Sequence, residues 1–184
     1  MHRFLHPHPD SSALPAVQLE VDVTCSRPGV LSLSYSVTGK LGDVLMPAVT
    51  TAVHADELWQ HSCFEAFVRA SAANEYYEFN FSPSTKWAAY RFNGYRSGMR
   101  PATDISPPTI KILSSPDQFI LHASIELDRL TDLQTPALLR LALSAVIEDR
   151  TGHKSYWALA HSPGKPDFHH PDCFTQEIPP TFQT

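Results

Sequence analysis

The sequence contains few cysteines, few charged residues and no long apolar run, and each shortage excludes a class of protein. Its three cysteines are odd in number and form no CxxC pair, which argues against a disulfide framework or a zinc ribbon and predicts reduced thiols. Charged residues make up 18% of the chain and the net charge is −5, so the basic stripe that nucleic-acid phosphates require is missing. No segment approaches the ~20 apolar residues of a membrane span, and residues 1–15 lack the apolar stretch of a signal peptide. We therefore expect a soluble cytoplasmic protein that binds neither nucleic acid nor a membrane.

Glycine is also scarce, with 7 residues against 16 prolines. So many prolines are typical of a chain rich in strands and loops rather than of a helix bundle. A chain of 184 residues is ordinarily one domain that buries roughly 70% of its unfolded surface. We expect a single domain over residues 1–184.

Several segments alternate apolar and polar residues, which is the period of a half-buried strand. Residues 17–24 and 30–37 alternate on either side of the turn sequence SRPG, and residues 109–115 and 118–127 do so around a Pro-Asp turn. These four segments predict two hairpins. Roughly nine short strands, with turn signals about every eight to twelve residues, favour a β-sandwich.

Residues 58–96 carry three further strand-like segments in which aromatic and polar side chains alternate. In the first segment Phe64, Ala66 and Val68 share one face, and polar residues share the other. If the three segments pair as neighbours, charged and amide groups gather on one polar surface with Trp87 nearby. These groups are Glu65, Arg69, Glu78, Asn80 and Arg91. Such a surface suits a ligand, and it suits equally the solvated face of an ordinary sheet.

Residues 135–148 fit two alternatives. As a helix, the segment would begin with Thr135 as its cap and Pro136 in its first turn, with apolar residues at a 3.6 period. As a strand, it places alternate apolar residues on one face. These residues are Leu139, Leu141, Leu143, Ala145 and Ile147. The pattern alone leaves both alternatives open.

Three blocks, taken in order, carry a resemblance to a known family. They read LWQHSCFEAFV, YYEFNFSPSTKWAAYRFNGYRSGM and SYWALAHSPGKPDFHHPDCF. With them the chain resembles bacterial DOMON-like proteins over nearly its whole length, and those proteins are similar to family-9 carbohydrate-binding modules. The resemblance implies an all-β antiparallel β-sandwich of immunoglobulin or jelly-roll type, and it favours the strand for residues 135–148. Members bind sugars or, in other branches, haem, so the resemblance alone does not settle the function.

The resemblance further implies a sugar held between aromatic rings by charged and amide groups. The rings would be Trp59, Trp87 and Trp157. The hydrogen-bonding groups would be Glu65, Glu78, Asn80 and Arg91, and Arg69 shares their predicted surface. The alternative for Trp59 and Trp157 is that each packs in the core with its indole N–H bonded to backbone. Because we expect a cytoplasmic protein, a small intracellular carbohydrate or glycoconjugate is the predicted ligand.

Glu65 and Glu78 also invite comparison with the paired carboxyl groups of a glycosidase, which stand ~5–10 Å apart across the scissile bond. We expect Arg69 and Arg91 to keep both carboxylates ionised in a salt-bridged network, whereas a catalytic acid needs a raised pKa. The prediction is therefore a non-catalytic ligand-binding domain and not an enzyme.

A loop rich in proline and histidine near the C-terminal end contains candidate metal ligands. They are His161, Asp167, His169 and His170. Their spacing matches no zinc motif, so they serve equally well to fasten the loop to the sandwich, with Ca²⁺ or Zn²⁺ binding as the alternative. Haem would need axial donors such as methionine with histidine, and Met99 is the best-placed methionine. A haem- or metal-binding module and a protein-interaction domain are thus the alternatives to sugar binding, and exposed sheet edges would allow a homodimer.

Overall fold

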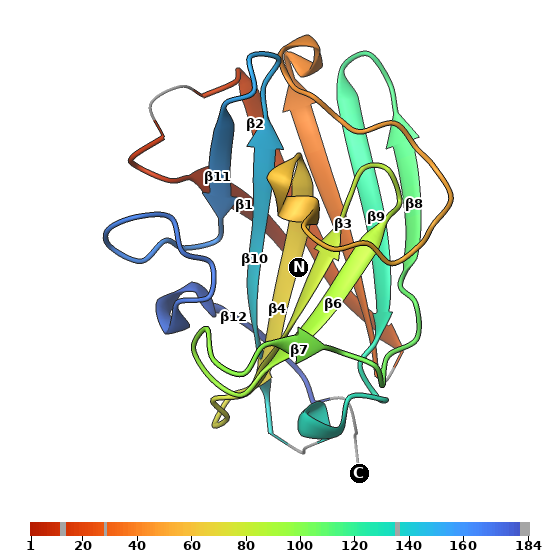
Figure 1. The fold of residues 1–184 in the computed structure, drawn as a ribbon, viewed down its shortest axis with the longest axis vertical. Coiled ribbons are helices and arrows are strands. Elements are labelled where there is room, and N and C mark those ends of the chain that lie inside the picture. The colour runs from red at the N-terminus through yellow and green to blue at the C-terminus, as the bar shows by residue number, and fades with distance from the viewer. Residues whose placement is uncertain (12–13, 28, 135–136, 181–184) are drawn as a thin grey trace.

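The computed structural model describes residues 1–11, 14–27, 29–134 and 137–180, and within them the chain forms two antiparallel sheets around one core (Figure 1). Sheet A contains, in spatial order, β1 (His2–Pro7), β2 (Val17–Arg27), β3 (Val30–Gly39), β9 (Gln118–Glu126) and β8 (Thr109–Ser114). Sheet B contains β7 (Arg100–Pro101), β6 (Trp87–Phe92), β5 (Tyr76–Phe81), β4 (Cys63–Ala70), β10 (Leu139–Glu148) and β11 (Lys154–Ala158), with β12 (Gln176–Ile178) also beside β10. The predicted all-β sandwich is confirmed.

Strand β1 belongs to both sheets. Its first part pairs with β2 of sheet A, where Arg3 lies opposite Val21. Its last part pairs with β11 of sheet B, where His6 lies opposite Ala158. The two sheets are therefore continuous along this side of the molecule.

The core is built from the inward faces of both sheets, as the period-2 pattern requires. The Phe64 ring of sheet B lies 5.1 Å from the Tyr35 ring and 6.0 Å from the Phe119 ring of sheet A, measured between centroids. The Tyr35 hydroxyl donates a 2.7 Å hydrogen bond to the Glu65 carbonyl oxygen, so a buried phenol across the core also finds a polar partner. This contact ties sheet A to the strand that carries the candidate site.

Both predicted hairpins are confirmed, as β2–β3 and β8–β9. The strand alternative for residues 135–148 is confirmed over β10, whose alternate residues from Leu139 to Ile147 are all buried in the core. Thr135 and Pro136, the cap and first turn of the helical alternative, lie outside the described residues, as does Pro28 of the first predicted turn.

Four short 3-10 helices interrupt the connections: η1 (Leu41–Asp43), η2 (Leu58–Gln60), η3 (Thr131–Leu133) and η4 (Pro171–Cys173). Of these, η2 packs against β4 and β5, and η4 packs against β10. Figure 1 shows η2 as the gold coil in front of β4 and η4 as the blue coil near β12. None of the described residues forms a helix long and apolar enough to cross a membrane.

The outward face of sheet B differs from the open polar surface that the sequence predicts. A second apolar cluster covers much of it, formed by sheet residues such as Phe67, Tyr76 and Tyr90 together with Phe168 and Phe174 of the loop 159–175. Alternation in these strands therefore does not separate a dry face from a wet one. It separates a large core from a smaller one that has polar groups at its centre.

Candidate functional site

The strand register brings four polar side chains into one row on the outward face of sheet B. Glu65 of β4 lies opposite Asn80 of β5 on one side and opposite Ser144 of β10 on the other. Glu78 lies on the same face, opposite Phe67 and one alternate position along β5 from Asn80. The structure thus unites Glu65, Glu78 and Asn80 as predicted from their alternation.

Both carboxyl groups of this row are buried with few partners. Glu65 is 3% exposed and Glu78 is 8% exposed. The Asn80 amide donates a 2.7 Å hydrogen bond to Glu78, whereas the Ser144 hydroxyl reaches Glu65 only at 3.3 Å. Buried carboxyl groups ordinarily have several hydrogen bonds or a cationic partner. This row of Glu65, Glu78, Asn80 and Ser144, which we name the acid row, has hydrogen-bonding capacity to spare.

The expectation that arginines hold these two glutamates in an ionised network is wrong. Among the described residues, no arginine or lysine nitrogen lies within 4.0 Å of either carboxyl group, whereas His169 Nε2 is 3.8 Å from Glu78. Burial, followed by the charge of Glu78, raises the pKa of Glu65 to about 8. Burial also raises the pKa of Glu78, against the opposing hydrogen bond from Asn80 and the charge of Arg96. Desolvation outweighs attraction here because no cation stands close enough to compensate.

The loop 159–175 covers one side of the acid row and is fastened by Asp167. The Asp167 carboxylate accepts hydrogen bonds from the Tyr95 hydroxyl and from Arg96, whose Nη2 lies at 2.7 Å. Partial burial alone would raise the pKa of Asp167, but these hydrogen bonds outweigh it and lower the pKa. Arg96 adopts a left-handed backbone with φ of 50°, a strained conformation for a non-glycine residue that persists where surrounding contacts impose it.

His169 stands between this loop and the acid row. Its Nδ1 lies 2.8 Å from the Tyr76 hydroxyl, while its ring packs on Phe67 and Phe92 at 5.0 Å and 5.2 Å between centroids. Burial, followed by the charge of Arg96, lowers the pKa of His169 to about 4. The imidazole is therefore neutral at pH 7 and offers one donor and one acceptor rather than a charge.

A cavity of about 290 Å³ opens beside His169, between the loop 159–175 and the turn after β6. Its lining combines aromatic rings with side chains that can form hydrogen bonds. They are Arg69, Asn74, Tyr76, Asn93, Tyr95, His169 and Phe174, together with Gly94 and Pro171. Apolar surfaces next to planar amide and guanidinium groups suit the C–H faces and hydroxyl rims of a sugar.

Trp59 lies on η2, the short 3-10 helix that packs against β4 and β5. It is 50% exposed, and the Lys154 ammonium lies 5.7 Å from its ring centroid. Its neighbour Leu58 packs against the second apolar cluster instead. The alternative in which Trp59 is a core residue is therefore wrong, and the ring is free to serve as a platform.

Three other predicted site residues lie away from the acid row. Because Phe81 pairs with Trp87 and Tyr77 with Arg91, both residues of β6 point to the opposite face of sheet B from Glu78. Arg91 there forms a bidentate ion pair with Asp132, its Nη2 donating at 2.6 Å. Trp157 is 5% exposed in the main core, and its indole N–H donates to the Ser155 hydroxyl at 2.9 Å. The prediction that Arg91 and Trp87 share one polar surface with Glu78 is wrong, since the register places Tyr90 opposite Glu78.

The candidate metal ligands are engaged elsewhere. His161 Nε2 lies 2.8 Å from the His6 carbonyl oxygen, and the His170 ring accepts a hydrogen bond from the Asp172 N–H at 3.3 Å. In the part of the chain that the structure describes, no group of three histidine, cysteine, aspartate or glutamate residues could hold a metal ion. Met99, the candidate haem ligand, is exposed in the segment before β7. Asp167 and His169 instead fasten the loop 159–175 to the sandwich, which is the alternative to metal binding stated above.

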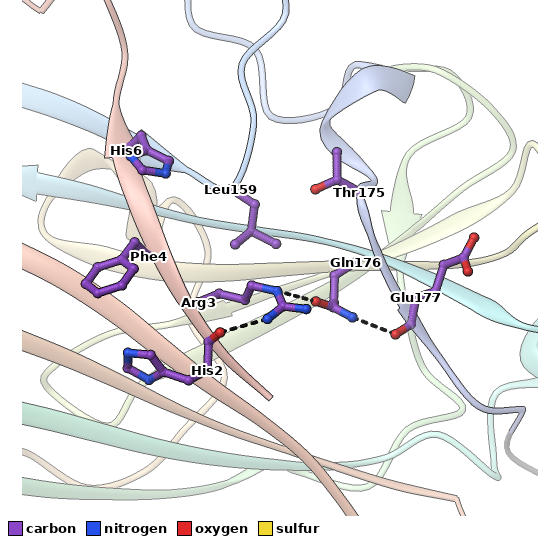
Figure 2. Close-up of a pocket in the computed structure, with 8 residues that line it drawn as sticks. All are labelled: His2, Arg3, Phe4, His6, Leu159, Thr175, Gln176 and Glu177. Carbon is purple, nitrogen blue, oxygen red and sulfur yellow. Dashed lines mark hydrogen bonds between the residues drawn. The ribbon is translucent and has the colours of Figure 1, made fainter.

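Two further cavities lie on other parts of the surface. One, of about 460 Å³, lies between β1 and β12, and Figure 2 shows Arg3 crossing it to donate to Gln176 at 2.8 Å. The other, of about 420 Å³, lies on the outward face of sheet A among small hydroxyl side chains. Neither is lined by a residue that contacts a buried carboxyl group with a raised pKa, whereas His169 lines the 290 Å³ cavity and lies 3.8 Å from Glu78. The acid row and its adjoining cavity are therefore the better candidate.

Sequence reasoning missed Tyr76, Tyr95, Asn74 and Ser144 as companions of the acid row. Tyr76 and Ser144 share the predicted polar faces of their strands, so strand alternation contained their signal. Tyr95 and Asn74 lie in turns, and no periodic pattern places a turn residue over a particular sheet face.

Comparison with known proteins identifies the fold rather than a family. No protein-family model matches the chain, and no curated protein matches its sequence. Among solved structures, a proposed carbohydrate-binding protein from Bacteroides uniformis is similar, with a TM-score of 0.66 and 15% identity over 95% of this chain and 84% of that one. A family 9 carbohydrate-binding module from Caldicellulosiruptor kristjanssonii in complex with glucose matches with a TM-score of 0.49 and 16% identity, over 83% of this chain and 72% of that one. A structure of such a module from the same organism in complex with cellotriose gives the same TM-score and identity, over 83% and 70%. The first similarity shows that two chains of low identity share one fold.

Proposed function

We propose that this chain binds a small carbohydrate or glycoconjugate on the outward face of sheet B, over the acid row, and catalyses no reaction on it. The observation that carries the proposal is the pair of buried carboxyl groups with an adjacent amide and too few protein partners. Sugar hydroxyls are both donors and acceptors, so they complement carboxyl and amide groups together. The similarity in fold to the Bacteroides uniformis protein also supports carbohydrate binding.

The placement of the two carboxyl groups supports binding without cleavage. Glu65 and Glu78 belong to adjacent strands and project from the same face of one sheet. Both would meet the same side of a bound sugar. Glycoside hydrolysis instead needs two carboxyl groups that flank the scissile bond. We therefore interpret the buried Glu65 carboxyl, whose pKa is raised by its burial, as a partner for sugar hydroxyls rather than as a general acid.

The DOMON-like relationship belongs to the same proposal and is supported by the three sequence blocks quoted above. Haem or metal binding is the alternative, and the histidine positions in the described structure give it little support. An absorption spectrum of the purified protein distinguishes them, because haem produces a Soret band and a sugar does not.

The test is calorimetric titration of the protein with glucose, N-acetylglucosamine and short glucans. We expect one of these to bind, and we expect Glu78→Gln to weaken that binding by roughly 10-fold, which corresponds to the loss of one hydrogen bond to a charged group. The melting temperature of the variant should stay level or rise, since a buried charge is removed. Trp59→Ala should weaken binding with a stability change within about 0.5 kcal/mol, because the ring is half exposed.

Glu126→Gln is the matched control. Glu126 lies on the outward face of sheet A, where it accepts a hydrogen bond from Ser106, so this change removes a carboxylate from elsewhere and should leave sugar binding intact. Failure of every sugar to bind a correctly folded protein would overturn the proposal. So would equal weakening by Glu78→Gln and Glu126→Gln.

A further inference from the structure

Arg69 is a cation without an anionic partner among the residues that the structure describes. It lies on β4, on the same face as the acid row, and lines the 290 Å³ cavity. Its guanidinium carbon stands 4.6 Å from the centroid of the Phe174 ring, which covers one flat side of the group. The edge of the group makes only one hydrogen bond, a long one of 3.4 Å to the Ala73 carbonyl oxygen, and its buried Nε has no hydrogen-bond partner.

The nearest charged residue makes this arrangement less favourable still. Arg140 of β10 lies directly opposite Arg69 in the strand register, and like charges in that position repel. Arg140 has its own carboxylate, Glu177, at 2.9 Å. For Arg69 no carboxylate oxygen lies within 4.0 Å in the described parts of the chain. Burial, followed by the charge of Arg140, lowers the pKa of Arg69, which shows that its surroundings disfavour the charge it carries.

Other groups at the cavity strengthen the same chemistry. The Asn74 side chain lines the cavity and makes no hydrogen bond to another described residue. Asp167, whose carboxylate bonds the lining residue Tyr95, is already engaged by Tyr95 and Arg96. The residues that line the cavity thus include unused donors on Arg69 and Asn74 and no carboxylate, in contrast to the acid row on the other side of His169.

We infer that the cavity beside Arg69 holds an anionic group of the ligand, a carboxylate or a phosphate, so that the carbohydrate bound by this chain is an acidic one. This inference rests on the proposed function. An oxyanion would meet the open edge of a guanidinium whose plane is already fixed by Phe174, and Arg is well suited to paired hydrogen bonds with such groups. The asymmetry of the site would then orient the ligand, with the acid toward Arg69 and neutral hydroxyls toward the acid row.

The test compares four probes by calorimetric titration: glucose, glucuronate, glucose 6-phosphate and inorganic phosphate. We expect at least one of the two acidic sugars to bind more tightly than glucose, and the comparison between them identifies carboxylate or phosphate as the source of the anion. Arg69→Gln should reduce the preference for the acidic sugar by roughly 10-fold or more, the effect of losing a charge-assisted hydrogen bond. Arg69→Lys should retain part of it, because the charge remains and the paired geometry is lost.

Arg140→Gln is the matched control, since it removes an arginine from the directly opposite position, outside the cavity lining. It should leave the preference unchanged. The measured quantity is a ratio of affinities within one protein, so it stays meaningful for a variant that is somewhat less stable.

Two results would overturn the inference: equal affinity for glucose and both acidic sugars, or a preference that Arg69→Gln does not reduce. In either case the sugar-binding proposal would stand. Binding of inorganic phosphate that Arg69→Gln abolishes, with no sugar bound at all, would support the anion site and overturn the proposed function instead.

Discussion

Glu65 is flanked by Asn80 and Ser144 in the strand register and is almost fully shielded from water. An unfolded glutamate has a pKa near about 4.3, whereas the native carboxyl titrates at about 8. Between those two values the native state holds a proton that the unfolded state has released. Raising the pH through this window therefore favours unfolding, and stability falls.

Glu65→Gln should remove this pH dependence. At pH 5 the variant and the parent both present a neutral side chain, so their free energies of unfolding should be similar. By pH 8 the difference should have moved in favour of the variant by on the order of 4 kcal/mol, about 1.4 kcal/mol for each pH unit, because the parent must either ionise a buried group or keep its proton against the solvent. Urea denaturation at several pH values between 5 and 8 measures the difference.

Glu126→Gln serves again as the control, since that carboxylate is partly exposed and its replacement should give a difference that barely changes with pH. A Glu65→Gln difference that is flat across the window, or that shrinks toward pH 8, would show that Glu65 is ionised in the native state at low pH.

The tryptophans show that residue type alone does not predict whether a side chain is exposed or buried. Trp59 and Trp157 looked equivalent as candidate platforms, yet one is half exposed and the other is in the core. Trp157 occupies a strand position opposite Ala145, which faces inward, so the sequence would have assigned it to the core once the pairing of β10 and β11 was known. For Trp59, which lies on a 3-10 turn, no period was available.

At the scale of elements, the acid row is enclosed by a contact between two connections. The turn after β6 supplies Tyr95 and Arg96, and the loop 159–175 supplies Asp167. The backbone N–H of His169, two residues further on, also donates a 3.1 Å hydrogen bond to the Asp167 carboxylate. The lowered pKa of Asp167 means that the contact is complete above the ordinary aspartate range and weakens as the pH falls below it. The cover over the site is thus held by charged contacts between two connections rather than by the sheets.

Asp167→Asn should loosen the loop 159–175 while leaving both sheets intact. The loss of one charged acceptor should destabilise this contact by about 1–2 kcal/mol, and amide hydrogen exchange should accelerate in the loop and in the turn after β6. Protection in β3 and β10, which lie in the sheets, should stay as in the parent.

Asp172→Asn, a change in the same loop, is the control, since that carboxylate is largely exposed and lies 3.5 Å from the His170 ring without an arginine or lysine partner among the described residues. Exchange that accelerates equally in both variants would mean that the Asp167 contact has no special role. Exchange that accelerates throughout the sheets in Asp167→Asn would mean that the loop is part of the global core.

The limits of sequence reasoning are clearest at this scale. Alternation placed Phe64 and Val68 on one face of β4 and Glu65 on the other, because side-chain direction within a strand is set locally. Which residues of neighbouring strands meet depends on the turn between them. Five residues, 82–86, connect Phe81 to Trp87, and this length places Ala88 beside Asn80 and Tyr90 beside Glu78. The sequence therefore did not reveal the pairing register between β5 and β6. That register places Arg91 on the opposite face of sheet B from Glu78.

For the molecule as a whole, one core joins the two sheets, and β1 contributes to it from the side. Leu5 of β1 is 3% exposed among residues of both sheets. A chain built in this way should unfold as a unit, since neither sheet can keep its inward face buried without the other. The all-β class could be predicted because it is encoded in many short alternating segments, each of which is a local signal. The covering of sheet B by a loop distant in sequence could not be predicted, because no local pattern encodes it.

Leu5→Ala should lower the stability of the entire molecule by about 2–5 kcal/mol, the usual effect of opening a cavity at a buried leucine. The loss should appear at one midpoint whether unfolding is followed by far-ultraviolet circular dichroism or by tryptophan fluorescence. Leu113→Ala, at a leucine that is 57% exposed, should change stability by no more than about 0.5 kcal/mol. Separate midpoints for the two signals in Leu5→Ala would indicate sheets that unfold independently.

The double membership of β1 has a consequence for the order in which the chain acquires its structure during synthesis. His6 pairs with Ala158, and the hydrogen bond from Arg3 to Gln176 spans 173 residues. Strand β1 is synthesised well before β11 and β12 and is thus among the last to find all its neighbours, and contacts of such long sequence separation form slowly. Until β11 and β12 emerge, β1 and β10 have free edges that are open to mispairing with other chains. The seam between β1 and β12 is the place where folding finishes.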